Sequence, residues 1–129
     1  MDTDLITLIA WDPPTDEPTF LARSDYVEQC WLPLLGPSSV LLLRHLADVV
    51  TTTPITLSLH DLARRIGVND SSARRTLLRL KNFRHLAILD DGTIGIRTLL
   101  PALAPAQARR LPPSAEAMHR QQLARFVLT

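Results

Sequence analysis

Apolar residues recur at helical spacing over most of the chain after residue 23, and short β-type runs separate the helical stretches. Ser24 followed by Asp25 is typical of a helix N-cap with an acid in the first turn, and Pro37 after Gly36 is typical of a first helical position. Pro33 restricts Leu32 and predicts that the first helix ends near Trp31. The predicted helices cover residues 24–31, 37–50, 59–66, 70–83 and 114–127.

Three short runs rich in β-branched and apolar residues predict strands. Residues 55–57 form one of them, while residues 86–89 and 93–97 flank the turn sequence Asp90-Asp91-Gly92 and predict a hairpin. Residues 5–11 are apolar enough to dock on the rest of the fold, and a strand is one form that this docking could take. The pattern as a whole predicts a mainly α fold with a small β-hairpin, in the α+β class.

Proline content divides the chain into three parts. Pro13, Pro14 and Pro18 deny helix and ladder hydrogen bonds to the stretch between residues 12 and 18. We therefore expect residues 1–23 to be an acidic, proline-containing arm and residues 24–100 to be the folded domain. Residues 101–129 are expected to be a Pro/Ala-rich linker followed by a C-terminal helix.

The two central predicted helices have complementary apolar faces and a short turn between them. Ser58 can cap the first helix, Gly67 permits the sharp turn, Val68 fills it, and Asn69 caps the following helix. Residues that share the inward faces at helical spacing are Leu59, Leu62, Ala63 and Ile66 in the first helix, and Ala73, Leu77 and Leu80 in the second.

The outward face of the second helix is basic. Residues 61–85 hold seven bases and two acids, a net charge of +5. Small hydroxyl side chains at the helix start would allow close approach to a major groove, and an arginine one turn later could fork onto guanine. We therefore expect base contacts from Ser71, Ser72 and Arg75. Arginines bordering that face suit phosphate contacts, and the expected set is Arg64, Arg65, Arg74, Arg79 and Arg97.

With these residues in place, the stretch from Thr56 to Ile96 resembles the winged helix-turn-helix domain of bacterial transcription regulators. The resemblance is carried by residues 62–75 together with Leu77 and Leu80, and it implies a winged helix-turn-helix fold with extra N- and C-terminal helices. The segment Trp-Leu-Pro-Leu-Leu-Gly at residues 31–36 is also similar to small, poorly characterised actinobacterial proteins. The acidic wing tip, Asp90-Asp91, departs from the family pattern, so either the wing avoids the DNA backbone or Arg97 alone contacts it.

Charge is unevenly distributed along the chain. Residues 1–30 hold seven acids against one base, a net charge of −6, while the remainder has a net charge of +7. This asymmetry favours a polyanionic partner for the basic part. The single cysteine, Cys30, cannot form an internal disulfide, and the acidic N-terminus does not resemble a signal peptide. No apolar run is long enough to span a membrane, so a cytoplasmic location is expected, with association to the nucleoid if the chain binds DNA.

No motif indicates catalysis, a metal or a cofactor. The four histidines lack metal-ligand spacing, the glycines form no phosphate-cradling loop, and no serine has the surroundings of a nucleophile. We expect no enzyme activity and no cofactor.

Two functions remain open at this point. The favoured hypothesis is sequence-specific binding of double-stranded DNA by a transcription regulator, with a homodimer formed through helices outside residues 55–97. The alternative is a protein-binding winged-helix adaptor that joins a larger assembly through the acidic arm, with Trp11 and Phe20 as partner-binding anchors.

Overall fold

The computed structural model describes residues 4–128, and its centre is a four-stranded mixed sheet. The strand order is β3-β1-β5-β4, with β1 Leu5–Ala10, β3 Ile55–Ser58, β5 Ile94–Ile96 and β4 Leu86–Ile88. β1 runs antiparallel to β3 and parallel to β5. A second sheet pairs β2, Thr19–Leu21, antiparallel with β6, Leu99–Pro101.

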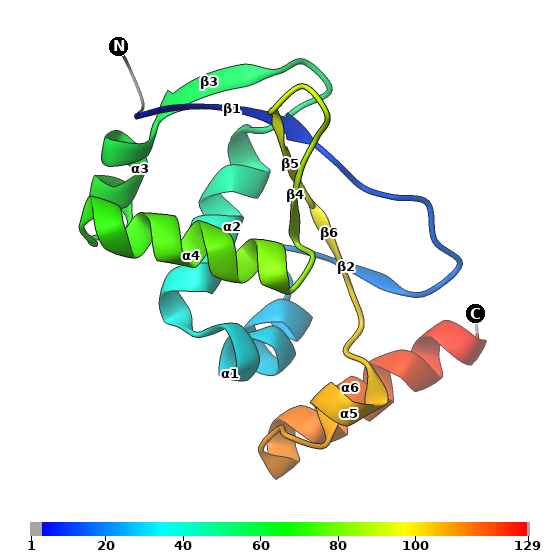
Figure 1. The fold of residues 1–129 in the computed structure, drawn as a ribbon. Coiled ribbons are helices and arrows are strands. Elements are labelled where there is room, and N and C mark those ends of the chain that lie inside the picture. Colours follow the sequence, from blue (N-terminus) through cyan, green and yellow to red (C-terminus); the bar gives the residue numbers. More distant parts are fainter. Residues whose placement is uncertain (1–3, 129) are drawn as a thin grey trace.

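Helices pack on the four-stranded sheet, and two further helices form the C-terminal part of the chain. α2, α3 and α4 lie together on one side of the four-stranded sheet, whereas α5 and α6 lie at the end away from β1 and β3 (Figure 1). The helical elements are the π-helix η1 Val27–Trp31, α1 Leu32–Leu35, α2 Pro37–Val49, α3 Leu59–Arg65, α4 Asp70–Asn82, α5 Pro105–Ala108 and α6 Pro113–Leu128. Within the described residues, no helix is long and apolar enough to cross a membrane.

The core gathers around α2, which contacts η1, α1, α4 and β5. Leu42, Leu43 and Leu46 on this helix are fully buried, as is typical of a central helix with a broad apolar face. In the helix pair that follows, Leu62, Ala73 and Leu80 are buried as expected. Leu77 is only half-buried, and Thr76 takes the buried place beside it with its hydroxyl bonded to the carbonyl of Ser72.

The predicted fold class, a winged helix-turn-helix, is wrong. The expected hairpin exists as β4 and β5, but β5 also pairs in parallel with β1, and β1 in turn pairs with β3. The result is an α/β fold with a four-stranded mixed sheet, a separate two-stranded sheet and six α-helices within residues 4–128. The error arose because the parallel pair joins segments far apart in the sequence, and no local pattern indicates it.

The segment from Leu5 to Ala10 docks on the fold as a central strand, a form of docking that its apolar sequence had indicated. Leu8 is fully buried, and Ile6 and Ala10 pack against the core. The second part of the predicted arm supplies β2, where Phe20 stacks on Tyr26 with ring centroids 3.9 Å apart. The prolines predicted correctly that the stretch between the strands has no regular structure.

The first predicted helix continues past Trp31. The amide of Leu32 donates to the carbonyl of Val27, five residues earlier, so the chain makes a π-turn and then enters α1 with Pro33 in its first turn. Proline is tolerated there because a first-turn amide has no partner within its own helix.

Gly95 is the one glycine whose missing side chain is required by packing. A Cβ at this position would lie 2.6 Å from Cβ of Trp11 and 2.8 Å from its Cγ. We expect Gly95→Ala to lower the free energy of unfolding by about 1–3 kcal/mol, because the atoms it meets are tied to the backbone of the neighbouring segment. Urea denaturation measures this, and a variant as stable as the parent would show that Trp11 does not cover β5.

Candidate nucleic-acid interface

α3 and α4 are joined by a short turn, and a side chain caps the start of each helix. Ser58 Oγ accepts from the amide of Asp61 at 3.2 Å, and Asn69 Oδ1 accepts from the amide of Ser72 at 2.7 Å. Gly67 has a φ of +76°, in the left-handed region that the turn requires. Both caps fall where the sequence predicted them. The short turn and the packing of α3 against α4 set the directions of the two outward faces.

Four arginines project from these helices into solvent, and we call them the arginine surface: Arg64, Arg65, Arg74 and Arg75. None of the four takes part in an ion pair within residues 4–128. Ser71, at the start of α4, is also exposed, and Ser72 is half-buried beside it. The surface therefore presents four positive charges that the described part of the chain does not neutralise by ion pairing.

Arg75 stands at the edge of a shallow hollow between α2 and α4. Its Nη2 donates to Ser72 Oγ at 3.1 Å. The hollow has a volume of about 250 Å³ and is lined by two arginines and three hydroxyl side chains, namely Arg75, Arg79, Ser38, Ser72 and Thr76. Donors of this kind are those that bind phosphate oxygens.

Arg79 has a structural role that the sequence did not indicate. Its Nε donates to the carbonyl of Leu35 at 2.8 Å and its Nη2 to the carbonyl of Leu34 at 2.5 Å, so it satisfies the C-terminal end of α1. Its guanidinium also lies 5.4 Å from the centre of the Phe83 ring. These contacts leave fewer donors for phosphate than the prediction assumed.

Arg97 lies apart from the arginine surface. It is half-buried, its Nε donates to the carbonyl of Leu99 at 3.0 Å, and burial lowers its pKa. It lines a pocket with Trp31 and Phe83 rather than the outward face of α4. The expected wing contact with DNA through Arg97 therefore has no geometric support.

Acidic side chains near the interface are partly engaged. Asp70 lies 2.8 Å from Nδ1 of His60, which ties the start of α4 to α3. At the hairpin tip, the amide of Thr93 donates to Asp91 and lowers the pKa of its carboxyl, so this carboxylate stays charged at neutral pH. A DNA backbone would be repelled from the tip.

Two acids of the N-terminal segment, Asp4 and Asp12, bind backbone amides and hydroxyl groups of the fold. Asp4 accepts from the hydroxyl of Ser58 at 2.5 Å and from the amide of His60 at 3.0 Å. Asp12 accepts from the amide and hydroxyl of Thr98 and from the amide of Leu99. Local sequence patterns give no sign of either role, because the partners lie more than fifty residues away.

The two predicted partner anchors are part of the packing. Trp11 covers Gly95, and Phe20 stacks on Tyr26. The Tyr26 hydroxyl accepts from the amide of Leu103 at 2.9 Å and lies 2.8 Å from Nδ1 of His119, and burial raises its pKa to about 12.

Cys30 is fully buried and unpaired, and desolvation raises its pKa to about 11, so it is held as the protonated thiol. Within residues 4–128, no group of three or more His, Cys, Asp or Glu side chains is arranged to hold a metal ion.

The chain was compared with known protein families, with curated proteins and with solved structures. None of the three comparisons finds a match to this chain.

Proposed function

We propose that the protein binds double-stranded DNA through the arginine surface of α3 and α4 and acts as a sequence-specific transcription regulator. The observation that carries the proposal is the set of four exposed arginines without ion-pair partners among the described residues, placed on two helices that pack against each other across a short turn. The proposal does not require the winged helix-turn-helix fold, because it depends on the charge and shape of this surface alone.

Phosphate contacts would supply most of the affinity. An exposed guanidinium gains little from a surface carboxylate, but several arginines lined along a duplex release condensed counterions from the phosphates. Arg64, Arg65 and Arg74 are the residues that we assign to this role.

Base contacts would come from the start of α4. Ser71 is exposed, and Ser72 offers its hydroxyl to Arg75 without neutralising the charge of the guanidinium. Arg75 keeps further N–H groups for the O6 and N7 acceptors of guanine.

Selection from a random duplex pool, followed by titration of variants on the selected duplex, tests the proposal. We expect Arg75→Ala to cost about 1–3 kcal/mol on the selected sequence and to relax base preference. Arg64→Ala should weaken selected and unselected duplexes alike and reduce the salt slope by about one unit. The matched control is Arg120→Ala on α6, which removes the same charge at a residue paired with Glu116 and should leave DNA affinity unchanged. A two-fold symmetric selected site would indicate a homodimer.

If Arg75→Ala and Arg64→Ala both bind the duplexes as tightly as the parent does, the assignment of the interface is contradicted. Failure to enrich any sequence while unselected duplexes still bind would retain phosphate binding and contradict the regulator. The alternative, a protein-binding adaptor, gains no support from Trp11 and Phe20, since both are half-buried and packed against Gly95 and Tyr26.

A further inference from the structure

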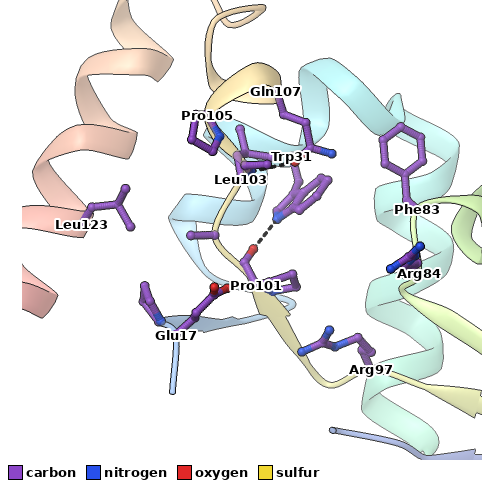
Figure 2. A pocket seen from close by; sticks show the side chains of 13 residues that line it. Glu17, Trp31, Phe83, Arg84, Arg97, Pro101, Leu103, Pro105, Gln107 and Leu123 are labelled. Atoms are coloured by element: carbon purple, nitrogen blue, oxygen red, sulfur yellow. Dashed lines mark hydrogen bonds between the residues drawn. The ribbon is translucent and has the colours of Figure 1, made fainter. Parts of the chain in front are cut away.

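A pocket of about 670 Å³ lies at the far end of α4 from the arginine surface. Residues after α4 and β5 form one side of it, the segment from Pro101 to Gln107 forms another, and Leu123 of α6 faces them across the opening (Figure 2). This volume is within the range of sites that bind small molecules, about 300–1,000 Å³. The pocket plays no part in the proposed DNA interface.

One wall of the pocket is aromatic. Trp31 and Phe83 both line it, and their rings meet edge to face with centroids 6.1 Å apart. The indole Nε1 of Trp31 already donates to the carbonyl of Pro101 at 2.9 Å, so the ring has no unsatisfied donor to present (Figure 2). Trp31 and Leu103 are almost fully buried, so the half-buried ring of Phe83 supplies most of the apolar surface that a ligand can reach, with Trp31 packed behind it.

Two arginines reach the same pocket. Arg97 extends beneath Trp31 from the segment after β5, and Arg84 follows α4 (Figure 2). Neither forms an ion pair within the described residues, and burial lowers the pKa of Arg97, which means that its charge is incompletely solvated. Glu17 lies on the pocket lining as well, so the three charged side chains leave a net charge of +1.

Arg84 occupies a backbone position that favours glycine. Its φ is +64°, and it is the only non-glycine residue with a positive φ among residues 4–128. It lies two residues past the end of α4, where the amide of His85 donates to the carbonyl of Leu80 and completes a helix-ending motif that commonly uses glycine. An arginine at this position gives the backbone no advantage, whereas its side chain adds a cation to the pocket.

From this combination we propose that the pocket binds a small aromatic carboxylate. The flat ring would lie against the accessible part of Phe83, next to the buried indole of Trp31, and the carboxylate would accept from Arg84 and Arg97. A guanidinium that is partly desolvated gains more from an anion than an exposed one does, and the planar fork matches a carboxylate.

The test is a titration of the full chain with 2-naphthoate, monitored by NMR through the backbone amide and tryptophan indole N–H signals. We expect the indole N–H signal of Trp31 to shift in a saturable way while that of Trp11 stays in place. The neutral analogue 2-naphthamide should bind at least about fivefold more weakly, because it lacks the charge that the arginines attract.

Two variants and one control locate the anion site. Arg84→Gly should keep the fold, since glycine suits a φ of +64°, and should weaken 2-naphthoate binding about tenfold. Arg97→Gln should weaken it by a similar factor, about tenfold, and Arg120→Ala should leave it unchanged. If Arg97→Gln fails to fold, the affinity of Arg84→Gly for 2-naphthoate still tests the proposal.

A Trp31 signal that does not move with 2-naphthoate would overturn the proposal, as would equal affinity of Arg84→Gly and the parent. The titration contains no DNA, so its outcome is independent of the proposed DNA interface.

Discussion

Deletion of residues 1–10 is expected to abolish cooperative folding of the chain. The deletion removes β1, which pairs with β3 on one side and with β5 on the other, and it leaves both neighbours with unpaired edges. It also removes Leu8, which is fully buried, and the anchor that Asp4 provides at Ser58 and His60. A domain of this size is stable by only about 5–15 kcal/mol, so the loss of a central strand exceeds what the remainder can absorb. Circular dichroism during urea denaturation should show no sigmoidal transition.

Two leucines of β1 provide a matched pair for the same prediction. Leu8→Ala should lower the free energy of unfolding by about 2–5 kcal/mol, because it removes a fully buried side chain and leaves a cavity. Leu5→Ala changes the same residue type in the same strand, but Leu5 is 49% exposed, and we expect a loss of less than about 1 kcal/mol. A truncated chain that unfolds as cooperatively as the parent would show that β1 is dispensable, as the arm interpretation assumed.

Stability is expected to fall steeply as the pH drops from about 6.5 to 4, and His85 is the main cause. The side chain is fully buried against Trp31, with ring centroids 4.4 Å apart, and neither ring nitrogen has a hydrogen-bond partner among the described residues. Desolvation, with a smaller contribution from the charge of Arg97, lowers its pKa from 6.5 to about 4. In this window the unfolded chain binds the proton and the folded chain does not, so each step down in pH favours unfolding. The accumulated loss is about 3 kcal/mol at pH 4 relative to neutral pH.

The variant His85→Leu separates this cause from other acid effects. It removes the titration and two unsatisfied polar atoms, so we expect it to be more stable than the parent at pH 5 and to have a shallower dependence on pH. A weaker dependence of the same sign remains, because burial also lowers the pKa of His119. His45→Gln is the control, since it removes a histidine that is only half-buried. If His85→Leu and the parent lose stability in parallel between pH 6.5 and 4, the buried neutral state of His85 is contradicted.

Local patterns predicted the elements better than they predicted their assembly. The caps at Ser58 and Asn69, the turn at Gly67 and the hairpin around Gly92 all lie where short-range chemistry placed them. The pairing of β1 with β5 places Leu8 opposite Ile94. Neither strand carries a local sequence signal that identifies its partner, since β5 has only three residues and β1 is followed by a proline-containing stretch. The prolines after β1 favoured assigning its segment to an arm outside the folded domain, although they affect only the stretch that follows the strand.

The candidate site was also predicted only in part from local patterns. Helical periodicity was sufficient to predict that Arg64, Arg74 and Arg75 face solvent. It could not predict the bonds of Arg79 to the end of α1 or the burial of Arg97, since the groups that surround them come from other parts of the chain. Periodicity shows which way a side chain leaves its own helix, and the neighbouring elements decide whether it reaches solvent.

The dependence of duplex affinity on salt tests the proposed function most directly. For the parent chain, the logarithm of the association constant should fall linearly with the logarithm of the salt concentration, with a slope of about −3 if Arg64, Arg65 and Arg74 each neutralise one phosphate. Replacing Arg64, Arg65, Arg74 and Arg75 together with Gln should bring the slope close to zero and remove measurable binding at physiological salt. A parent slope near zero, or a slope that the fourfold variant retains, would contradict DNA binding by the arginine surface.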